Sequence, residues 1–115
     1  MAKSEIQVIE YIDEAEKNPF ADWLAKLTDK AHAKVVSAIY LMKAGNFGDV
    51  KPVGGGVSER RIHWGPGLRI YFARDGSKLI LLLGGGTKSR QTKDINNAKA
   101  AWAEYKSRKK NDESN

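Results

Sequence analysis

Two short runs of the sequence, Val57 to His63 and Leu68 to Arg74, contain four side chains that can act on a phosphodiester. These side chains are Arg61, His63, Arg69 and Tyr71. The runs flank Gly65-Pro66-Gly67, a strong turn signal, so we expect them to pair as an antiparallel hairpin. Because strand side chains alternate between faces, a pairing of Trp64 with Leu68 would gather the four polar groups on one face. The cross-strand pairs would be His63 with Arg69 and Arg61 with Tyr71.

This set of two guanidinium groups, an imidazole and a phenol is suited to RNA cleavage. Arginine forks bind phosphate oxygens and stabilise the charge that develops on them, and histidine or tyrosine can transfer protons. In-line attack by a 2′-hydroxyl needs a base, an acid and cations around the phosphorus, so we expect no metal ion or other cofactor. Three more cations come just before a predicted helix, a position that favours an anion: Lys88, Arg90 and Lys93.

Each of these residues also has a purely structural interpretation. Arg61 and Arg69 could cover a solvated strand face or pair with Glu59, and His63 could be an ordinary surface histidine beside a turn. Tyr71 could simply cover the sheet, because a phenol with a pKa of about 10 acts as a base only when strongly perturbed. The three cations before the helix could equally be solvated.

Composition narrows the class of protein. The 115 residues suit one domain, and the absence of cysteine excludes disulfides and thiolate metal sites. The longest apolar run, Leu79 to Leu83, is far too short to span a membrane, and residues 1–17 lack the pattern of a secretory signal, so we expect a cytoplasmic protein with no membrane partner. Residues 51–110 hold fourteen Lys and Arg against four acidic residues, an excess of ten positive charges within a net charge of +6. Such a surface is typical of proteins that bind nucleic acid.

Periodicity and capping residues predict an α+β domain of order β-α-α-β-β-β-α, with a mainly antiparallel sheet packed against a helical hairpin and a C-terminal helix. Asn18 and Thr28 are candidate caps for the two helices of the hairpin, and Thr92 for the last helix. The glycine-rich residues 46–56 are expected to form a connecting loop, and Gly84-Gly85-Gly86 to end the last strand. The predicted strands are 6–12, 57–63, 68–74 and 78–83; residues 1–110 form the domain and residues 111–115 a mobile polar tail.

Two segments carry a resemblance to a known family. Residues 58–76 read SERRIHWGPGLRIYFARDG, and residues 81–102 read LLLGGGTKSRQTKDINNAKAAW. Together with the opening strand and the NPFADWLAKL helix, they resemble the addiction-module killer branch of the RelE/ParE toxin superfamily, and are similar to HigB-type toxins. The resemblance implies a RelE-like fold and a type II toxin that cleaves messenger RNA, commonly on the ribosome. Its partner would be an antitoxin, usually a helix-turn-helix protein.

Carried over residue by residue, the resemblance implies that Arg69 and Lys88 bind the scissile phosphate and that Arg61 assists them. The proton carriers are less defined, because some relatives use a tyrosine where this chain has Lys93, Asp94 and Ile95. The candidates are His63, Tyr71 and Asp94. Further contacts with RNA are expected from Arg60, Arg90 and Lys93.

Two other functions stay open at this point. ParE-type relatives share the fold and poison DNA gyrase without cleaving RNA, and a toxin scaffold could also have lost its activity. A fold by itself does not decide between these functions.

Overall fold

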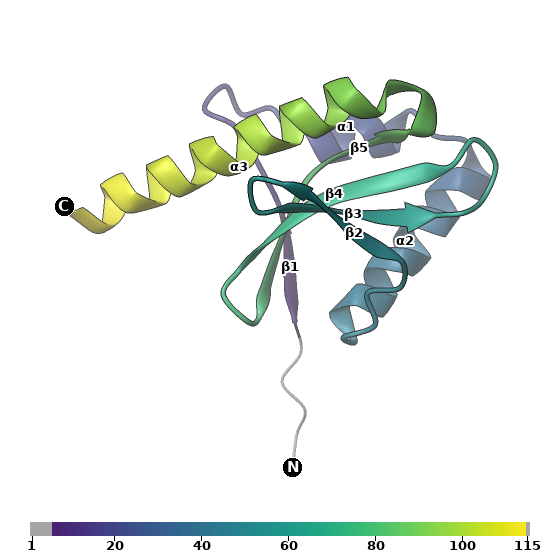
Figure 1. Ribbon diagram of the computed structural model, residues 1–115, viewed down its shortest axis with the longest axis horizontal. Helices are drawn as coiled ribbons and strands as arrows, with labels where there is room; N and C mark the ends of the chain where they lie inside the picture. The colour runs from purple at the N-terminus through teal and green to yellow at the C-terminus, as the bar shows by residue number, and fades with distance from the viewer. Residues whose placement is uncertain (1–5, 115) are drawn as a thin grey trace, which may run out of the picture.

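A computed structural model describes residues 6–114 of the chain. This range contains a five-stranded mixed sheet and three α-helices, which confirms the predicted α+β class (Figure 1). The elements in chain order are β1 (Gln7–Glu10), α1 (Pro19–Ala25), α2 (Asp29–Lys43), β2 (Val50–Gly54), β3 (Val57–Ile62), β4 (Leu68–Asp75), β5 (Leu79–Thr87), the 3-10 helix η1 (Lys88–Arg90) and α3 (Gln91–Ser114).

The sheet has the strand order β1-β5-β4-β3-β2. Strands β2 to β5 follow one another through short connections and pair antiparallel, whereas β1 lies parallel to β5. β1 pairs only with Leu79 to Leu82, which is the first half of β5. The second half of β5 therefore has β4 on one side and, within the described residues, no strand on the other.

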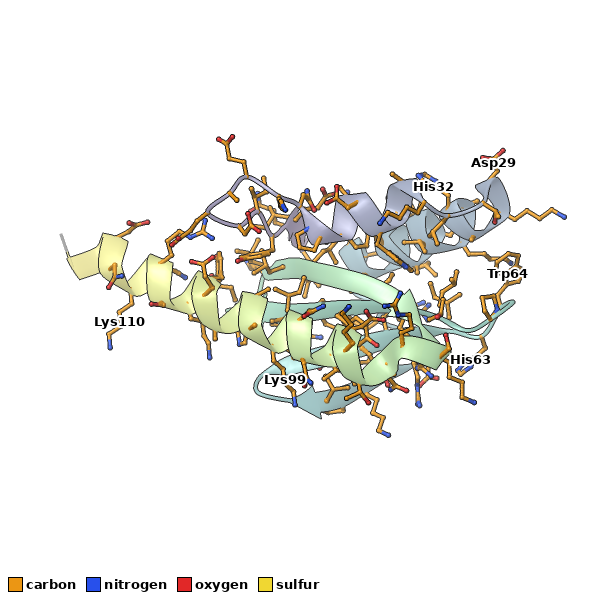
Figure 2. All side chains as sticks on the ribbon, turned by 90° about the horizontal axis from the view of Figure 1, so that it is seen from above. Asp29, His32, His63, Trp64, Lys99 and Lys110 are labelled. Atoms are coloured by element: carbon orange, nitrogen blue, oxygen red, sulfur yellow. The ribbon has the colours of Figure 1, made fainter. Side chains whose placement is uncertain are left out.

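Helices cover both faces of the sheet, as Figure 2 shows from above. α1 and α2 pack on one face around Phe20, Val35, Met42, Ile70 and Phe72. α3 packs on the other face, where Ala98 and Trp102 contact the side chains of neighbouring strands. α3 therefore covers part of the polar cluster that was predicted on this face, including Tyr71.

The helix caps of the hairpin follow the sequence prediction. Asn18 accepts a hydrogen bond from the Ala21 amide at 2.9 Å, and Thr28 accepts one from the Ala31 amide at 3.3 Å. These side chains satisfy amides that have no partner within the first turn of a helix. Thr92 is not a cap, because α3 begins at Gln91 and continues directly from η1.

Two glycine-rich segments form more strand than we expected. β2 lies inside the predicted loop 46–56, and as an edge strand it tolerates Pro52, which could not donate to a ladder inside the sheet. β5 continues through the glycine triplet to Thr87 instead of ending before it. The observed order thus has one more strand than the predicted β-α-α-β-β-β-α.

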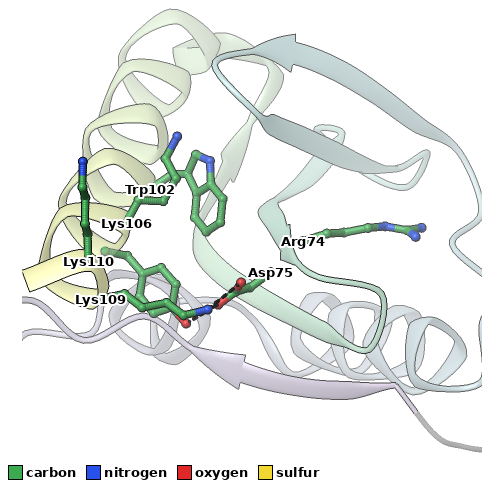
Figure 3. A pocket seen from close by; sticks show the side chains of 7 residues that line it. Arg74, Asp75, Trp102, Lys106, Lys109 and Lys110 are labelled. Carbon is green, nitrogen blue, oxygen red and sulfur yellow. Dashed lines mark hydrogen bonds and ion pairs between the residues drawn. The ribbon is translucent and has the colours of Figure 1, made fainter. Parts of the chain in front are cut away.

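α3 is also longer than predicted and is tied to the rest of the molecule near its C-terminal end. The Tyr105 hydroxyl donates to Asp75 at 2.8 Å, and the Lys109 ammonium lies 2.8 and 2.9 Å from the same carboxylate, whereas Arg74 points away from this group (Figure 3). Residues 111–114 of the predicted tail are helical, and Asn115 and residues 1–5 lie outside the described residues. The mobility of the tail stays a prediction. No helix within residues 6–114 combines the length and the apolar character needed to cross a membrane.

Candidate functional site

The β3–β4 hairpin brings Arg61 and Arg69 together more directly than expected. The two residues are cross-strand partners, and Ile62 pairs with Leu68, so the predicted register is wrong by two residues. The cause is a longer loop: His63 to Gly67 connect the strands, with the Trp64 amide bonded to the Ile62 carbonyl and the Gly67 amide to the Trp64 carbonyl. The two guanidinium-bearing residues therefore start from adjacent points on the same face of the sheet.

Asp49, just before β2, binds both the guanidinium and the imidazole of the hairpin. Its Oδ1 lies 3.0 Å from Arg61 Nη2, and its Oδ2 lies 2.5 Å from His63 Nε2. The hydrogen bond from His63, followed by that from Arg61, holds the pKa of Asp49 below its usual value. An ionised carboxylate only accepts hydrogen bonds, so Nε2 of His63 carries the proton and Nδ1 keeps its lone pair when the ring is neutral.

The His63 imidazole is open to solvent. Its side chain is 74% exposed, whereas those of Arg61 and Asp49 are about one third exposed. Figure 2 shows His63 and Trp64 at the end of the molecule where α3 begins. This arrangement presents an imidazole in a fixed tautomer, beside a guanidinium, to any ligand that approaches this end of the sheet.

Arg69 lies in a different environment, beneath the start of α3. Its Nη1 lies 3.4 Å from Oε2 of Glu59, a residue that is only 1% exposed. Gln91 from α3 donates to both oxygens of the same carboxylate at 3.2 and 3.3 Å. Arg69 is thus held inside the protein by a carboxylate that is also bonded to α3.

Tyr71 is buried in the same layer, although it shares a sheet face with Arg61 and Arg69 as predicted. Its hydroxyl has no hydrogen-bond partner within the described residues. Burial, with the nearby charges of Glu59 and Asp94, raises its pKa to about 12. The phenol is neutral at physiological pH and inaccessible to solvent, which is unfavourable for the proton transfer that the sequence suggested for it.

The predicted cations after β5 are all exposed, and Lys88 is attached to the hairpin. The Lys88 amide donates to the Gly67 carbonyl at 3.2 Å, which fixes the start of η1 against the loop that carries His63. Arg90 ends η1 and Lys93 lies in the first turn of α3. Arg60, in contrast, lies on the opposite sheet face, where its guanidinium packs over Gly48 and donates to the Arg61 carbonyl.

Asp94 lies apart from the His63 group, on the β5 side of the sheet. Its carboxylate packs directly over Gly86, where a Cβ atom would overlap it. Burial raises the pKa of Asp94, against the lowering effect of the charges on Arg90 and Lys93. The candidate residues therefore form an exposed group around His63 and an inner group of Arg69 and Tyr71, which Asp94 flanks on the β5 side.

The comparison with known proteins adds a relative. No family model matches the chain. A protein of Haemophilus influenzae described as an uncharacterized protein is 46% identical over 81 residues, which cover 70% of this chain and 82% of the relative. The chain belongs to the same family as this protein. That description assigns no activity to the relative, so it adds nothing to what the site itself indicates about function.

Two residues of the site were not anticipated, Asp49 and Gln91. Glu59 was named only as a structural partner for Arg61 or Arg69, and its pairing with Arg69 is confirmed. Asp49 lies in a segment expected to be a loop, twelve residues before Arg61, and periodicity gives no information on such a contact. The position of Glu59 could be predicted, because it is two residues from both Val57 and Arg61 in the same strand and therefore lies on the face of the predicted cluster. Its role as the partner of Arg69 depends on the cover provided by α3.

Proposed function

We propose that this chain is the toxin of a type II toxin–antitoxin module, a HigB-like member of the RelE/ParE superfamily that inhibits translation by cleaving messenger RNA. The observation that supports this proposal best is the group formed by Asp49, Arg61 and His63, with Lys88 attached to the same loop. It combines an oriented proton carrier with cations on an accessible surface. The resemblance of residues 58–76 and 81–102 to such toxins agrees with it.

The proposed reaction is in-line transesterification of RNA. Nδ1 of His63 takes the proton from a 2′-hydroxyl, and the 2′-oxygen attacks the adjacent phosphorus. The bond from phosphorus to the 5′-oxygen breaks and that oxygen takes a proton from solvent, while His63 releases its proton to solvent. The products are a 2′,3′-cyclic phosphate and a 5′-hydroxyl end. Asp49 holds the imidazole in the required tautomer, as a carboxylate does for histidine in other hydrolytic sites.

The cations have two proposed roles, according to their exposure. Arg61, which shares the Asp49 carboxylate with His63, and the exposed Lys88, whose backbone is attached to the same loop, stabilise the charge on the phosphorane. Arg90 and Lys93 bind neighbouring phosphates of the RNA. Arg69 is assigned a supporting role, since its guanidinium is buried against Glu59 and is not exposed like that of Arg61. Arg60 is assigned to packing on the opposite face.

The partners in this proposal are messenger RNA, commonly on a ribosome in the cytoplasm, and an antitoxin encoded with the toxin. Antitoxins of this branch are usually helix-turn-helix proteins. The cations around His63 suit a polyanion better than a protein target, which favours RNA over gyrase.

Mapping of messenger RNA 5′ ends shortly after induction tests the proposal. We expect cuts at codon-phased positions in translated regions, and a loss of cleavage rate of about 10²- to 10⁴-fold in His63→Gln, the range for removal of a general base. Lys88→Ala should also lose cleavage, whereas Lys30→Ala, in α2 on the sheet face opposite α3, should cleave like the wild type. Intact RNA with growth arrest and DNA-damage signalling would indicate gyrase as the target, and intact RNA with normal growth an inactive binding module.

A further inference from the structure

A groove runs along the free edge of β5, between α1 and the start of α3. Past Leu82 the described part of the chain places no strand beside this edge, so outward-facing backbone groups of Gly84 to Gly86 line the floor. Two adjoining hollows of about 180 and 360 Å³ share Pro19, Gly85 and Asp94. The larger hollow falls within the range of about 300–1,000 Å³ that is typical of small-molecule sites.

The glycines of the floor permit two side chains to approach the strand closely. The Trp23 indole lies directly against Gly85 from the α1 side, and the Asp94 carboxylate lies directly against Gly86 from the α3 side. Gly84, which precedes these two glycines in β5, has open space beside it: no neighbouring atom lies within 4 Å of the point where a Cβ would stand. The groove thus has an aromatic wall, a carboxylate wall and an open place on the floor.

The Asp94 carboxylate is not satisfied by the protein. Within residues 6–114 neither of its oxygens has a hydrogen-bond or ion-pair partner, although the residue is partly buried. The amide of Asn97 and the hydroxyl of Thr87 line the same groove, and Lys26 and Arg90 are at its wider part. A complementary ligand has two adjacent N–H donors, a flat apolar ring and a nearby negative charge.

Among the four RNA bases, guanine fits this description. Its N1–H and N2–H₂ groups lie side by side on the Watson–Crick edge, and a carboxylate with two acceptor oxygens matches that pair. None of the other three bases has two adjacent donors on this edge. Adenine has one N–H₂ donor beside the acceptor N1, cytosine has one beside the acceptors N3 and O2, and uracil has one N–H donor between two carbonyl acceptors, so each would turn an acceptor towards the carboxylate. Single-stranded RNA bases are commonly read in this way, by stacking on an aromatic ring and by hydrogen bonds to that edge.

We propose that the groove between Trp23 and Asp94 binds a guanine nucleotide, with its phosphate at Lys26 and Arg90. As a subsite for the RNA substrate this inference rests on the proposed function. Gly86 lies beside Arg69, and Arg69 beside Arg61, so the groove is two strands, or about 10 Å, from the group around His63. A guanine bound there would lie near the nucleotide that is cleaved, and the enzyme would prefer a guanine at a fixed distance from the cut.

A nuclear magnetic resonance titration of the full chain with GMP, AMP, CMP and UMP tests the inference. We expect GMP to bind most tightly and to shift the amides of Gly84 to Gly86 and the indole N–H of Trp23. Asp94→Asn replaces one carboxylate oxygen, an acceptor, by an amide N–H₂ donor that would face the donors of guanine. It should lower the affinity for GMP by about tenfold or more, the loss expected for a hydrogen bond to a charged group. Glu14→Gln makes the same change of charge in an exposed loop outside the groove and should keep the preference for GMP.

Equal affinity for the four nucleotides, an unchanged GMP affinity in Asp94→Asn, or shifts outside the groove would overturn the inference. The absence of chemical-shift changes in the groove with all four nucleotides would also overturn the inference, and would favour a protein segment as the ligand of the strand edge. The titration involves no cleavage, so its result is separate from the proposed function. GMP binding without RNA cleavage in cells would support the guanine site and contradict the ribonuclease activity. RNA cleavage in cells without a response to GMP would support the ribonuclease activity and contradict the guanine site.

Discussion

The carboxylate of Glu59 lies 3.4 Å from the guanidinium of Arg69, and both side chains are almost completely removed from water. Two opposite charges in such a place must satisfy each other, because the cost of burying either one alone is large. Gln91 completes the group by donating from α3 to the same carboxylate. The ion pair therefore connects β3, β4 and α3 under the surface that carries His63.

Removal of one partner should destabilise the fold strongly. We expect Glu59→Ala to lower the free energy of unfolding by about 3–5 kcal/mol, because it leaves Arg69 buried without a counter-charge. The double variant Glu59→Leu, Arg69→Met should lose much less, since no charge is then buried. Urea denaturation followed by circular dichroism measures both effects, with Glu14→Ala, an exposed loop variant, as the control expected to change stability by less than about 0.5 kcal/mol. If the double variant lost as much unfolding free energy as the two single variants together, the buried ion pair would not be the source of the effect.

The glycine triplet gives a matched pair of substitutions at neighbouring positions. A methyl group at Gly85 would overlap the Trp23 ring, whereas at Gly84 it would meet no atom within 4 Å. We expect Gly85→Ala to lower the free energy of unfolding by about 1–3 kcal/mol, as overpacking does, and Gly84→Ala to change it by less than about 0.5 kcal/mol. Chemical denaturation decides the matter, and equal stability of the two variants would show that Trp23 does not pack on this strand as described.

Much of this architecture was accessible from the sequence. Capping residues at Asn18 and Thr28 gave the starts of α1 and α2, because their side chains act locally. Alternation placed Arg61, Arg69 and Tyr71 on one face of the hairpin. The register was missed because the pattern of Gly65-Pro66-Gly67 does not reveal that His63 and Trp64 belong to the loop.

The remaining differences come from tertiary contacts. Tyr71 was expected in an accessible polar cluster, although Val57 and Ala73 on the same face already indicated a cover. Gly84 to Gly86 were read as the end of a strand because glycine has a low strand propensity, yet a strand needs glycine where other groups approach its backbone closely. The atoms that approach these glycines belong to Trp23 in α1 and Asp94 in α3. The periodicity of the strand sequence does not predict contacts with side chains of other elements.

The C-terminal contact of α3 should make stability depend on pH. The hydrogen bonds from Lys109 and then Tyr105 lower the pKa of Asp75 below its usual value of 3.8. A lowered carboxyl pKa contributes stability above the unfolded pKa, and that contribution is lost as the pH falls through the folded pKa. We expect Asp75→Asn to be less stable than the wild type at pH 7, by about 1 kcal/mol, and the two proteins to converge below about pH 4. Thermal denaturation from pH 7 to pH 2 measures this, and a constant difference across the range would rule out the ionised pair as its source.

RNA binding should depend on salt through the exposed cations near His63. Each phosphate contact of a single strand contributes about 0.7 to the slope of log K against log salt, because a counterion is released. We therefore expect Lys88→Ala and Arg90→Ala each to reduce the slope by about 0.7, and Lys30→Ala on α2 to leave it unchanged. A fluorescent RNA oligonucleotide titrated at several salt concentrations, in a His63→Gln background that prevents cleavage, gives the slopes. If the antitoxin covers this surface, its complex with the toxin should show a weaker and less salt-dependent affinity for the same RNA. Equal slopes for Lys88→Ala and Lys30→Ala would place the RNA on a different face of the protein.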